Sequence, residues 1–511
     1  MTNSEVTSIQ SQIIGKSQKV AVVDLGSNSF HLVLARIVEQ DVQILLKEKL
    51  RVRLAQGLDI NLNLSEESIE RGLRTLAIYA ETLKGFHPSK VNIIATYTLR
   101  VANNASKFLQ RAKAIIPYPI QVVSGQEEAR LIYQGVAHSM HYQENRLVVD
   151  IGGGSTEFII GNGFNTLALS SRNVGCVSLS KTHFGQGKIN KKRFKNALLA
   201  AEQELEPIVD KFKNITWKLA IGTSGTASAL TEIAHANNFC QGPLTHQALT
   251  DIKNAVLKFD HFEQIKLKGL TTDRQHVIVG GLIIMMAIFD LFEITQLEYC
   301  DKALREGALY EMDDNLQHED IRERSIESLI NRVSVDVQHN EHVALTCLQL
   351  LKQSQPGWDF NAIPETPRYL RWASALHEVG LHINSSNYHK HSAYVIENAG
   401  MLGFNQDEVT LLATLIRLHR KKILNELIPE LSLFDYKWVA RLIVIFRLSV
   451  LFNQKRQKDF LPTWQFKVHK NNAELEFPQA WLTNKELFKA NLDTEIKQMQ
   501  KLGIKLTYKG V

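Results

Sequence analysis

The feature that most constrains this chain is an Asp-x-Gly turn that occurs twice, with the two aspartates 126 residues apart. The first copy is residues 22–29 (VVDLGSNS) and the second is residues 148–156 (VVDIGGGST). An apolar, β-branched run ends at each aspartate, which predicts a strand that enters a tight turn. Glycine permits the sharp turn and lets backbone N–H groups approach an anion. Two such turns facing each other across a cleft could hold a phosphate chain and its metal ion.

Both turns carry side chains suited to that role. Asp24 and Asp150 can hold a divalent cation, and the Ser and Thr hydroxyls can complete the contacts. A third glycine motif, residues 221–226 (IGTSGT), follows another apolar strand. A single Asp-x-Gly turn is most often an ordinary hairpin, but three related motifs favour phosphate binding. The candidate phosphate-binding residues of these motifs are Gly26, Ser27, Asn28, Ser29, Gly152, Gly153, Gly154, Ser155, Thr156 and Gly225.

Together the three motifs resemble the phosphate and nucleoside-side motifs of the actin, sugar-kinase and heat-shock-ATPase superfamily. The resemblance implies an α/β fold with two ribonuclease-H-like (actin-like ATPase) domains around a phosphate cleft. Both halves begin with a strand and an Asp-x-Gly turn and continue into helices, which hints at an internal duplication. An all-α HD-like domain and a small α+β domain follow. The expected divisions are a loose tail (1–16), two actin-like domains (17–130 and 131–310), the HD-like domain (311–430) and a basic α+β domain (431–511).

Composition and length indicate an intracellular enzyme of several domains. The chain has 511 residues, 44% of them hydrophobic, which is more than one core needs. Its four cysteines lie far apart with no CxxC pair, which argues against a disulfide framework or a zinc ribbon. Residues 1–19 are too polar for a signal peptide.

The most apolar run, residues 277–289, is shorter than the roughly 20 residues that cross a bilayer. We read it as a buried helix in which Gly280 and Gly281 allow close packing. The expected location is therefore the cytoplasm, with peripheral contact to the inner face of the cell membrane as an option and no transmembrane segment.

Positive charge is concentrated near the C-terminus. Residues 411–470 contain twelve Lys and Arg against four Asp and Glu. A basic module attached to a phosphate-binding module favours a long polyanionic partner other than nucleic acid. The plainer alternative is a solvated helix face, or a surface for a partner or a membrane. The candidate channel residues for a polyanion are Arg417, Arg420, Lys421, Lys422, Lys455 and Arg456.

A pair of glutamates favours a hydrolase over a kinase. Residues 124–130 (SGQEEAR) follow an apolar strand and open a helix at the junction of the first two domains. One carboxylate near the cleft could orient and deprotonate a water molecule for in-line attack on a terminal phosphorus. Alternatively, Glu127 and Glu128 only complement the helix dipole.

Six segments, in their order and spacing, resemble the exopolyphosphatase/guanosine-pentaphosphate phosphatase family: residues 24–31 (DLGSNSFH), 98–100 (TLR), 124–132 (SGQEEARLI), 150–157 (DIGGGSTE), 222–226 (GTSGT) and 303–307 (ALREG). The resemblance implies processive, Mg²⁺-assisted removal of terminal orthophosphate from inorganic polyphosphate. It also implies a homodimer, and it allows a monovalent cation such as K⁺ as a further cofactor.

The same resemblance implies roles for individual residues. Glu128 would be the base that activates water, with Glu127 as the next candidate. Arg100 and Arg305 would contact phosphate. Asp150 and Glu157, together with Asp24, would organise the metal ion or its water.

Alternatives remain within and outside this family. One is guanosine pentaphosphate 5′-phosphohydrolase activity. Against it, the second turn has Gly154 where the pentaphosphate enzymes carry alanine, and the histidine-containing segment 376–394 also reads more like a polyphosphatase. A small-molecule kinase of the superfamily and a non-enzymatic actin-like filament or phosphate-sensing scaffold are the other two.

The helical region resembles HD-type metal phosphohydrolases, which ligate metal through a His-Asp pair and further histidines. Here the pair is His377 and Glu378, and no later aspartate completes the set. We therefore favour a helical scaffold with packed histidines over a second catalytic centre.

Overall fold

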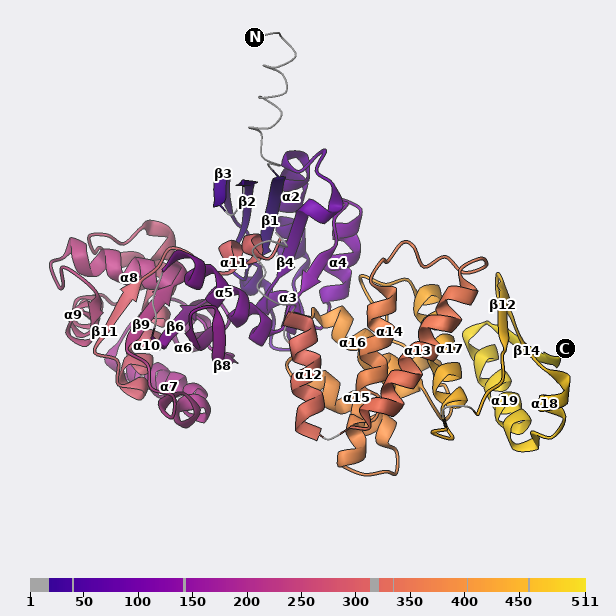
Figure 1. Ribbon diagram of the computed structural model, residues 1–511. Helices are drawn as coiled ribbons and strands as arrows, with labels where there is room; N and C mark the ends of the chain where they lie inside the picture. Colours follow the sequence, from indigo (N-terminus) through magenta and orange to yellow (C-terminus); the bar gives the residue numbers. More distant parts are fainter. Residues whose placement is uncertain are drawn as a thin grey trace, which may run out of the picture. The chain divides into compact units, whose positions relative to one another are not determined.

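The computed structural model describes residues 18–38, 41–140, 144–312, 321–333, 335–401, 403–457 and 460–511. The chain separates into two compact units, Met1–Glu319 and Asp320–Val511 (Figure 1). The tail expected at residues 1–16 lies outside the described residues. Each unit is described below by itself.

The first unit contains two mixed sheets. The first sheet has the strand order β3-β2-β1-β4-β5 and the second has the order β10-β11-β9-β6-β7-β8. The strands of the first sheet are β1 (Gln18–Leu25), β2 (Ser29–Val38), β3 (Asp41–Arg51), β4 (Val91–Ala95) and β5 (Ile120–Val122). Those of the second are β6 (Arg146–Ile151), β7 (Thr156–Asn162), β8 (Asn165–Arg172), β9 (Leu219–Thr223), β10 (Leu244–Thr245) and β11 (Gln296–Tyr299).

Both sheets are built to the same plan. β1 pairs antiparallel with β2 and parallel with β4, and β6 pairs antiparallel with β7 and parallel with β9. β3 and β8 continue the antiparallel side of their sheets. Each Asp-x-Gly turn thus joins the first two strands of its sheet. The repeat confirms the prediction of two ribonuclease-H-like domains.

Helices connect and cover these strands. In the first domain they are η1 (Leu54–Gly57), α2 (Glu66–Thr82), η2 (Pro88–Lys90), α3 (Tyr97–Val101) and α4 (Ala105–Lys113). The remaining helices of the unit are α5 (Gly125–Ser139), α6 (Cys176–Phe184), α7 (Lys191–Lys213), α8 (Ser224–Ala236), α9 (His246–Val256), η3 (Phe262–Gln264), η4 (Thr272–Arg274), α10 (Gln275–Phe292) and α11 (Leu304–Tyr310). In Figure 1, α2 and α4 cover one face of the first sheet, and α11 and α5 lie on its other side.

The two sheets share a hydrophobic core that α5 and α11 fill. It combines Val22 of β1 and Val148 of β6 with Leu131 of α5 and Leu309 of α11. The domain boundary expected between residues 130 and 131 therefore falls inside a helix that belongs to both halves. The helices cross closely because glycines face the partner backbone. A Cβ on Gly307 would lie only 1.8 Å from the Leu131 carbonyl oxygen.

The apolar run at residues 277–289 is a core helix, as predicted. In the described part of the chain, one helical segment, Thr272–Phe292, is long and apolar enough to cross a membrane, and 78% of its apolar window is buried inside the protein. A Cβ on Gly280 would lie 2.6 Å from the Cys176 carbonyl oxygen, and one on Gly281 would lie 2.5 Å from Thr226 Cγ2. These two glycines therefore bring α10 close to α6 and α8.

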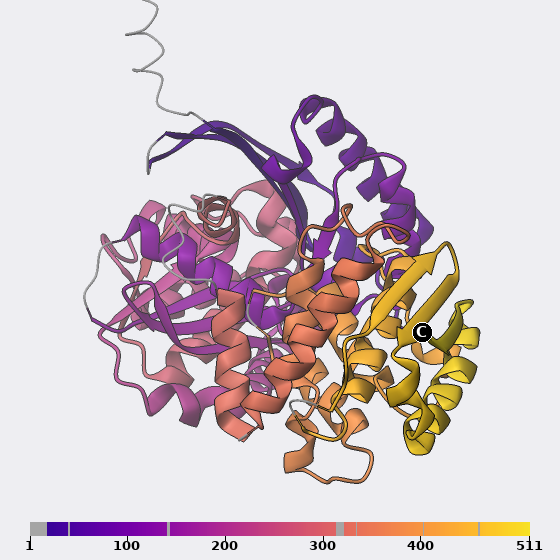
Figure 2. The ribbon, with the colours of Figure 1, turned by 45° about the vertical axis from the view of Figure 1, so that its right-hand side comes forward.

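The second unit combines helices with a small sheet. Its helices are α12 (Ile321–Val333), α13 (Val337–Ser354), α14 (Thr366–Leu376), η5 (Val379–His382), α15 (Tyr388–Asn398), α16 (Gln406–Leu418), η6 (Asn425–Leu427), α17 (Tyr436–Phe452), α18 (Gln479–Thr483), α19 (Glu486–Met499) and η7 (Gln500–Leu502). Strands β12 (Gln465–His469), β13 (Asn472–Phe477) and β14 (Lys505–Gly510) form the sheet. Figure 2 shows the yellow C-terminal strands and helices packed together.

One hydrophobic core runs through this second unit. It extends from Ile326 of α12 to Leu506 of β14. The buried Arg447 of α17 ties the parts together, because it binds Glu495 of α19 at 2.7 and 2.8 Å and the Lys421 carbonyl oxygen at 2.8 Å. The helical and α+β regions, expected as separate domains at 311–430 and 431–511, thus share a core.

We predict that Gly307→Ala loosens the junction of the two actin-like domains. The added methyl group would overlap the Leu131 carbonyl and force α5 and α11 apart, which should lower the free energy of unfolding by about 1–3 kcal/mol. Thermal unfolding measures the effect. Gly242→Ala is the control, because a Cβ at Gly242 meets nothing within 4 Å. Equal stability of the two variants would contradict a tight glycine crossing.

Candidate active site

The two Asp-x-Gly turns lie against each other. Both are tight, since a Cβ on Gly26 would lie 2.9 Å from the Ser29 carbonyl oxygen and one on Gly152 would lie 3.0 Å from that of Ser155. A Cβ on Gly153 would lie 3.0 Å from Ser27 Cβ. The structure therefore brings the predicted phosphate-binding turns together across the junction of the domains.

Not every residue of the turns faces the same way. Thr156 is fully buried and its hydroxyl donates to the Val174 carbonyl oxygen, so it supports the second turn from behind. The Ser27 hydroxyl accepts a hydrogen bond from Thr98 at 2.8 Å. Gly225 of the third motif packs against Arg274, where a Cβ would overlap the guanidinium group.

Four carboxylates from different elements gather next to the turns. Asp24 ends β1, Asp150 lies near the end of β6, Glu157 lies on β7 and Glu128 lies in the first turn of α5. Asp150 Oδ2 accepts hydrogen bonds from the hydroxyls of Thr223 (2.9 Å) and Ser224 (2.6 Å), so the third motif joins the second.

The other carboxylates differ in their partners. Glu157 Oε1 accepts from the Ser171 hydroxyl at 2.8 Å, and Glu128 Oε2 accepts from Arg100 Nη1 at 2.9 Å. The same Arg100 nitrogen also donates to the Val123 carbonyl oxygen at 2.9 Å. Asp24 Oδ1 is buried and has no hydrogen-bond partner among the described residues. Apart from Glu127, the side chains predicted to be catalytic and metal-binding thus share one location, where one carboxylate oxygen of Asp24 has no partner among the described residues.

Crowding and burial make these carboxylates hard to ionise together. Burial raises the pKa of Glu128, and Arg100 opposes that rise while Asp150 adds to it. Burial raises the pKa of Asp24 to about 7, with Arg305 opposing the rise and the neighbouring carboxylates reinforcing it. Burial, followed by repulsion from Glu128 and Asp150, raises the pKa of Glu157 well above its ordinary value. A proton or a cation would relieve the repulsion.

The donor set fits a hard divalent cation. Carboxylate and hydroxyl oxygens are the ligands that Mg²⁺ prefers, and the buried, unpartnered Asp24 Oδ1 is a ligand atom without another role. Asp24, Asp150 and Glu157 are the residues that could hold such an ion.

Glu127 has a different environment from Glu128. Its carboxylate oxygens accept two hydrogen bonds from Arg130, at 2.6 and 2.8 Å, and Arg130 also pairs with Glu311. Glu127 and Arg130 are both buried. The structure therefore places the second candidate base in an ion pair that holds α5, away from the cleft carboxylates.

The sequence did not predict most of the basic residues that lie beside the four carboxylates. Arg305 Nη1 donates to His31 Nδ1 at 2.5 Å, and burial together with Arg305 lowers the pKa of His31 to about 2. Burial lowers the pKa of Lys49, and Arg274 and Arg305 act in the same direction. Lys47 Nζ lies 3.1 Å from Glu306 Oε1. Of these basic residues, only Arg305 was predicted from the sequence to belong to the site.

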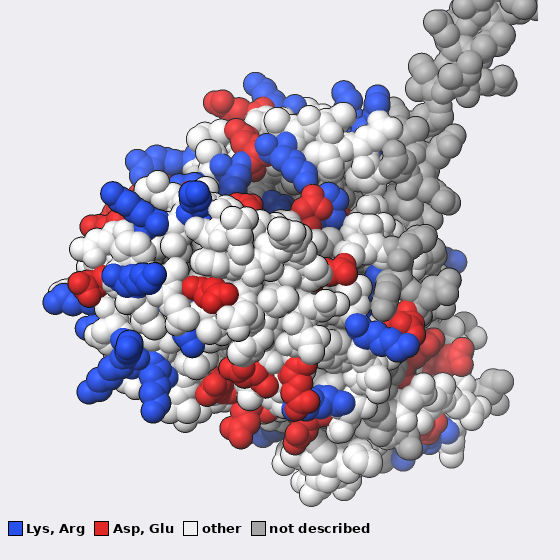
Figure 3. Space-filling view, turned by 90° about the vertical axis from the view of Figure 1, so that its left-hand side faces the viewer, with Lys and Arg blue, Asp and Glu red and all other residues white. Residues whose placement is uncertain are grey.

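A signal for this cluster was present in the sequence. Lys47, Lys49 and Arg51 alternate along β3, so their side chains share one face of the strand. Figure 3 shows Lys and Arg side chains around a hollow on one face of the molecule. A concentration of positive charge in a recess suits a ligand with several phosphate groups.

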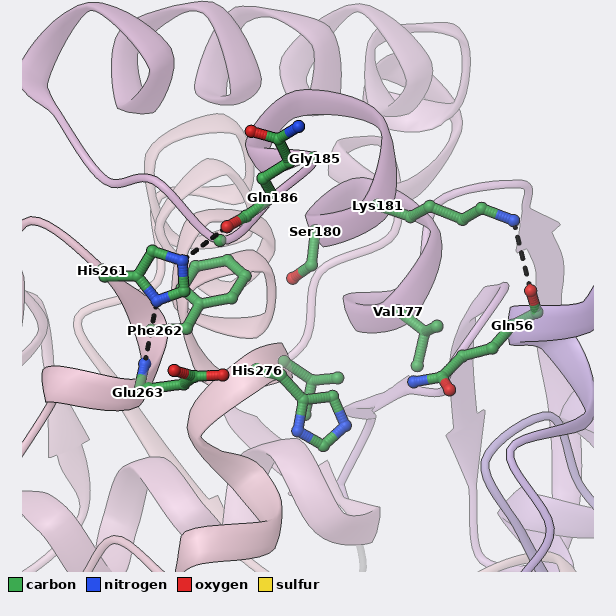
Figure 4. Close-up of a pocket in the computed structure, with 12 residues that line it drawn as sticks. Gln56, Val177, Ser180, Lys181, Gly185, Gln186, His261, Phe262, Glu263 and His276 are labelled. Atoms are coloured by element: carbon green, nitrogen blue, oxygen red, sulfur yellow. Dashed lines mark hydrogen bonds between the residues drawn. The ribbon is translucent and has the colours of Figure 1, made fainter.

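A pocket of 380 Å³ lies near the turns, and Figure 4 shows the side chains that line it. Residues of the two domains line it: Gln56, Val177, Ser180, Lys181, Gly185, Gln186, Gly187, His261, Phe262, Glu263, His276 and Val277. The Val177 N–H donates to the Gly153 carbonyl oxygen at 2.9 Å, and the Ala55 N–H donates to that of Ser27 at 3.0 Å. The lining residue Val177 is therefore bonded to the second turn, and Ala55, the chain neighbour of the lining Gln56, is bonded to the first. No motif in the sequence predicted this pocket.

The residues predicted to form a polyphosphate channel lie in the second unit. Lys421, Lys422 and Lys455 are exposed. Arg420 stacks over the Tyr388 ring, with its guanidinium carbon 4.7 Å from the centroid, and Arg417 lies 3.8 Å from Glu397.

Arg456 is the least suited to a mobile polyanion. It binds Asp336 at 2.8 Å and the buried Glu378 at 2.5 Å. Its charge is thus committed to acidic side chains of its own unit, whereas a channel formed by the other members stays a prediction.

Comparison with known proteins agrees with this geometry. The model of the Ppx/GppA phosphatase family matches residues 33–316, and the model of domain III of Ppx/GppA phosphatases matches residues 321–496. Two curated relatives, from Vibrio atlanticus and Pseudoalteromonas translucida, are each named guanosine-5′-triphosphate,3′-diphosphate pyrophosphatase. Both are 38% identical to this chain, over 94% and 95% of it and 96% and 97% of their own lengths.

A solved structure, described as an exopolyphosphatase from Cytophaga hutchinsonii, is 25% identical and has a TM-score of 0.53. The match covers 59% of this chain and 99% of that one. The chain belongs to the Ppx/GppA phosphatase family.

Proposed function

We propose that the protein hydrolyses the terminal 5′-phosphate of guanosine-5′-triphosphate,3′-diphosphate, which replaces inorganic polyphosphate as the main substrate expected. The curated relatives carry that nucleotide in their names. The observation that carries the proposal is the pocket beside the turns. Its 380 Å³ is within the usual range for small-molecule sites, and a nucleoside could occupy it. Polyphosphate has no base or sugar to place there.

The glycine that favoured a polyphosphatase has a packing explanation. A Cβ on Gly154 would lie 2.1 Å from Tyr97 Cδ1. Any larger residue would collide with that ring, so Gly154 reflects the presence of Tyr97 rather than the choice of substrate.

In this mechanism Glu128 accepts the proton of the attacking water, and Arg100 holds the Glu128 carboxylate in place. Backbone N–H groups of the two turns bind the terminal phosphates, and Arg305 and Lys49 offset their charge. Mg²⁺, held by Asp24, Asp150 and Glu157, would neutralise phosphate oxygens when bound. The products are orthophosphate and the nucleotide shortened by one 5′-phosphate.

Polyphosphate hydrolysis is the second candidate. It is favoured by the likeness to the solved exopolyphosphatase and by the exposed Lys421, Lys422 and Lys455. Initial rates of phosphate release from guanosine pentaphosphate and from long polyphosphate, measured side by side, distinguish the two. A higher kcat/KM on polyphosphate would overturn the proposed substrate. The homodimer and the monovalent cation stay predictions.

Glu128→Gln should abolish turnover and leave binding intact. Removing a general base costs on the order of 10²–10⁴-fold in rate, while the isosteric amide keeps the volume of the side chain. Steady-state rates and nucleotide binding by calorimetry measure both effects. Glu81→Gln, at an exposed position of α2, is the matched control. More than about a third of the wild-type rate in Glu128→Gln would rule out this base.

Asp24→Asn should stabilise the metal-free protein above neutral pH. Since the pKa of Asp24 is raised to about 7 from 3.8, its protonated form contributes stability below pH 3.8 that is lost as the pH rises through about 7. A neutral amide avoids the buried charge, which costs about 1–3 kcal/mol.

Magnesium should stabilise the wild type more than the Asp24→Asn variant. At pH 8, Mg²⁺ should raise the melting temperature of the wild type and have a smaller effect on Asp24→Asn. Thermal unfolding with and without Mg²⁺ tests both statements. Identical magnesium responses would count against Asp24 as a ligand.

Glu263→Gln tests the nucleoside pocket. The two oxygens of the Glu263 carboxylate can accept hydrogen bonds from the N1–H and amino group of guanine, whereas an amide replaces one of these oxygens with an NH2 donor. We expect a several-fold higher KM for guanosine pentaphosphate, an unchanged kcat and no effect on short polyphosphate. Glu206→Gln, exposed on α7, is the control. Equal KM increases for both substrates would place the effect outside a base-specific pocket.

A further inference from the structure

Four histidines from different helices meet inside the second unit. They are His339 of α13, His377 at the end of α14, His389 of α15 and His419 at the end of α16. The ring centroid of His377 lies 5.8 Å from that of His339 and 5.3 Å from that of His419. All four are at most 6% exposed. Such a set of polar rings is costly to bury unless it has a role.

Three of the side chains here converge on one point. One ligand atom each from His339, His377 and Glu378 lies within 4.8 Å of the other two, and all three residues are buried. Among the described residues, no other three His, Cys, Asp or Glu side chains bring their ligand atoms this close together. The ligands come from α13 and from the loop after α14, which are packed in one core.

Each of the three side chains has a buried polar atom without a hydrogen-bond partner among the described residues. His377 Nε2 and Glu378 Oε2 are buried and make no hydrogen bond in the described part of the chain, and the same is true of His339 Nδ1 and His389 Nδ1. Buried polar atoms are nearly always satisfied, so unsatisfied ones in a single cluster call for a ligand.

A hydrogen bond also orients His377 as a metal ligand. His377 Nδ1–H donates to the Ser374 carbonyl oxygen at 2.7 Å, which leaves the Nε2 lone pair directed away from the helix backbone. Neutral imidazole is the form that binds metal ions.

Charge around the cluster is balanced by outer residues. Arg456 donates to Glu378 Oε1 at 2.5 Å and therefore orients this carboxylate with Oε2 left over. Asp336 pairs with the same guanidinium at 2.8 Å. Carboxylates that bind metal are usually held by such hydrogen bonds from outside.

We propose that His339, His377 and Glu378 bind one divalent transition-metal ion of the Zn²⁺ class. Two imidazole nitrogens and one carboxylate oxygen form a donor set that such ions prefer over Mg²⁺, and three protein ligands leave a position open. The site is separate from the carboxylates of the first unit and independent of the proposed substrate. It reverses the expectation of packed histidines, because Glu378 supplies the oxygen that the missing aspartate would provide.

Zinc titration of the full-length chain tests this site. The protein is stripped with a chelator, desalted and titrated with ZnCl₂ by calorimetry, with Mg²⁺ in excess to occupy the carboxylates of the first unit. The wild type should bind one equivalent, and zinc should raise its melting temperature. His377→Ala should weaken zinc binding by at least about tenfold. His382→Ala, at an exposed histidine of the same unit, should match the wild type.

A second variant guards against misfolding. Glu378→Gln keeps the volume of the side chain and an acceptor for Arg456 but loses the negative charge, so it too should bind zinc at least about tenfold more weakly. Circular dichroism verifies that each variant is folded. Wild-type zinc affinity in a folded His377→Ala or in Glu378→Gln, or no tight equivalent in the wild type, would overturn the proposal.

Discussion

The close crossing of α5 and α11 is the contact on which the site depends. Gly135 and Gly307 let the two helix backbones approach, and their flanking side chains fill the space between the sheets. The same crossing positions Glu128, in the first turn of α5, and Arg305, in the first turn of α11. Because an Asp-x-Gly turn joins the first two strands of each sheet, holding the sheets together also holds the turns together. The packing of the sheets and the geometry of the candidate site therefore depend on the same two helices.

Electrostatics then divides the site into two halves. Four carboxylates repel one another on one side, and Arg305 and Lys49 repel one another on the other, as the raised and lowered pKa values indicate. Both strains are relieved by a ligand that carries phosphate groups together with a cation. Clustered charges of this kind are common in active sites.

The second unit is held together in a different way from the first. Its single core joins the helices to the C-terminal sheet, and Arg447 links α17 to α19 in its interior. The basic residues near its surface are unequal, since Arg456 serves Glu378 while Lys421 and Lys422 are exposed. A count of charges along the chain could not separate these roles, because the count carries no information about which side chains already have partners.

Local sequence alone determined the strands, the glycine turns and the buried helix, because each depends on patterns within about ten residues. Two copies of one motif then predicted two similar domains. Only the tertiary structure showed that Glu127 pairs with Arg130 and Glu128 with Arg100, since adjacent positions of a helix point in different directions and packing selects the partners of each. It also brought together Lys49 with Arg274, and His339 with His377, because these contacts join segments far apart in the chain.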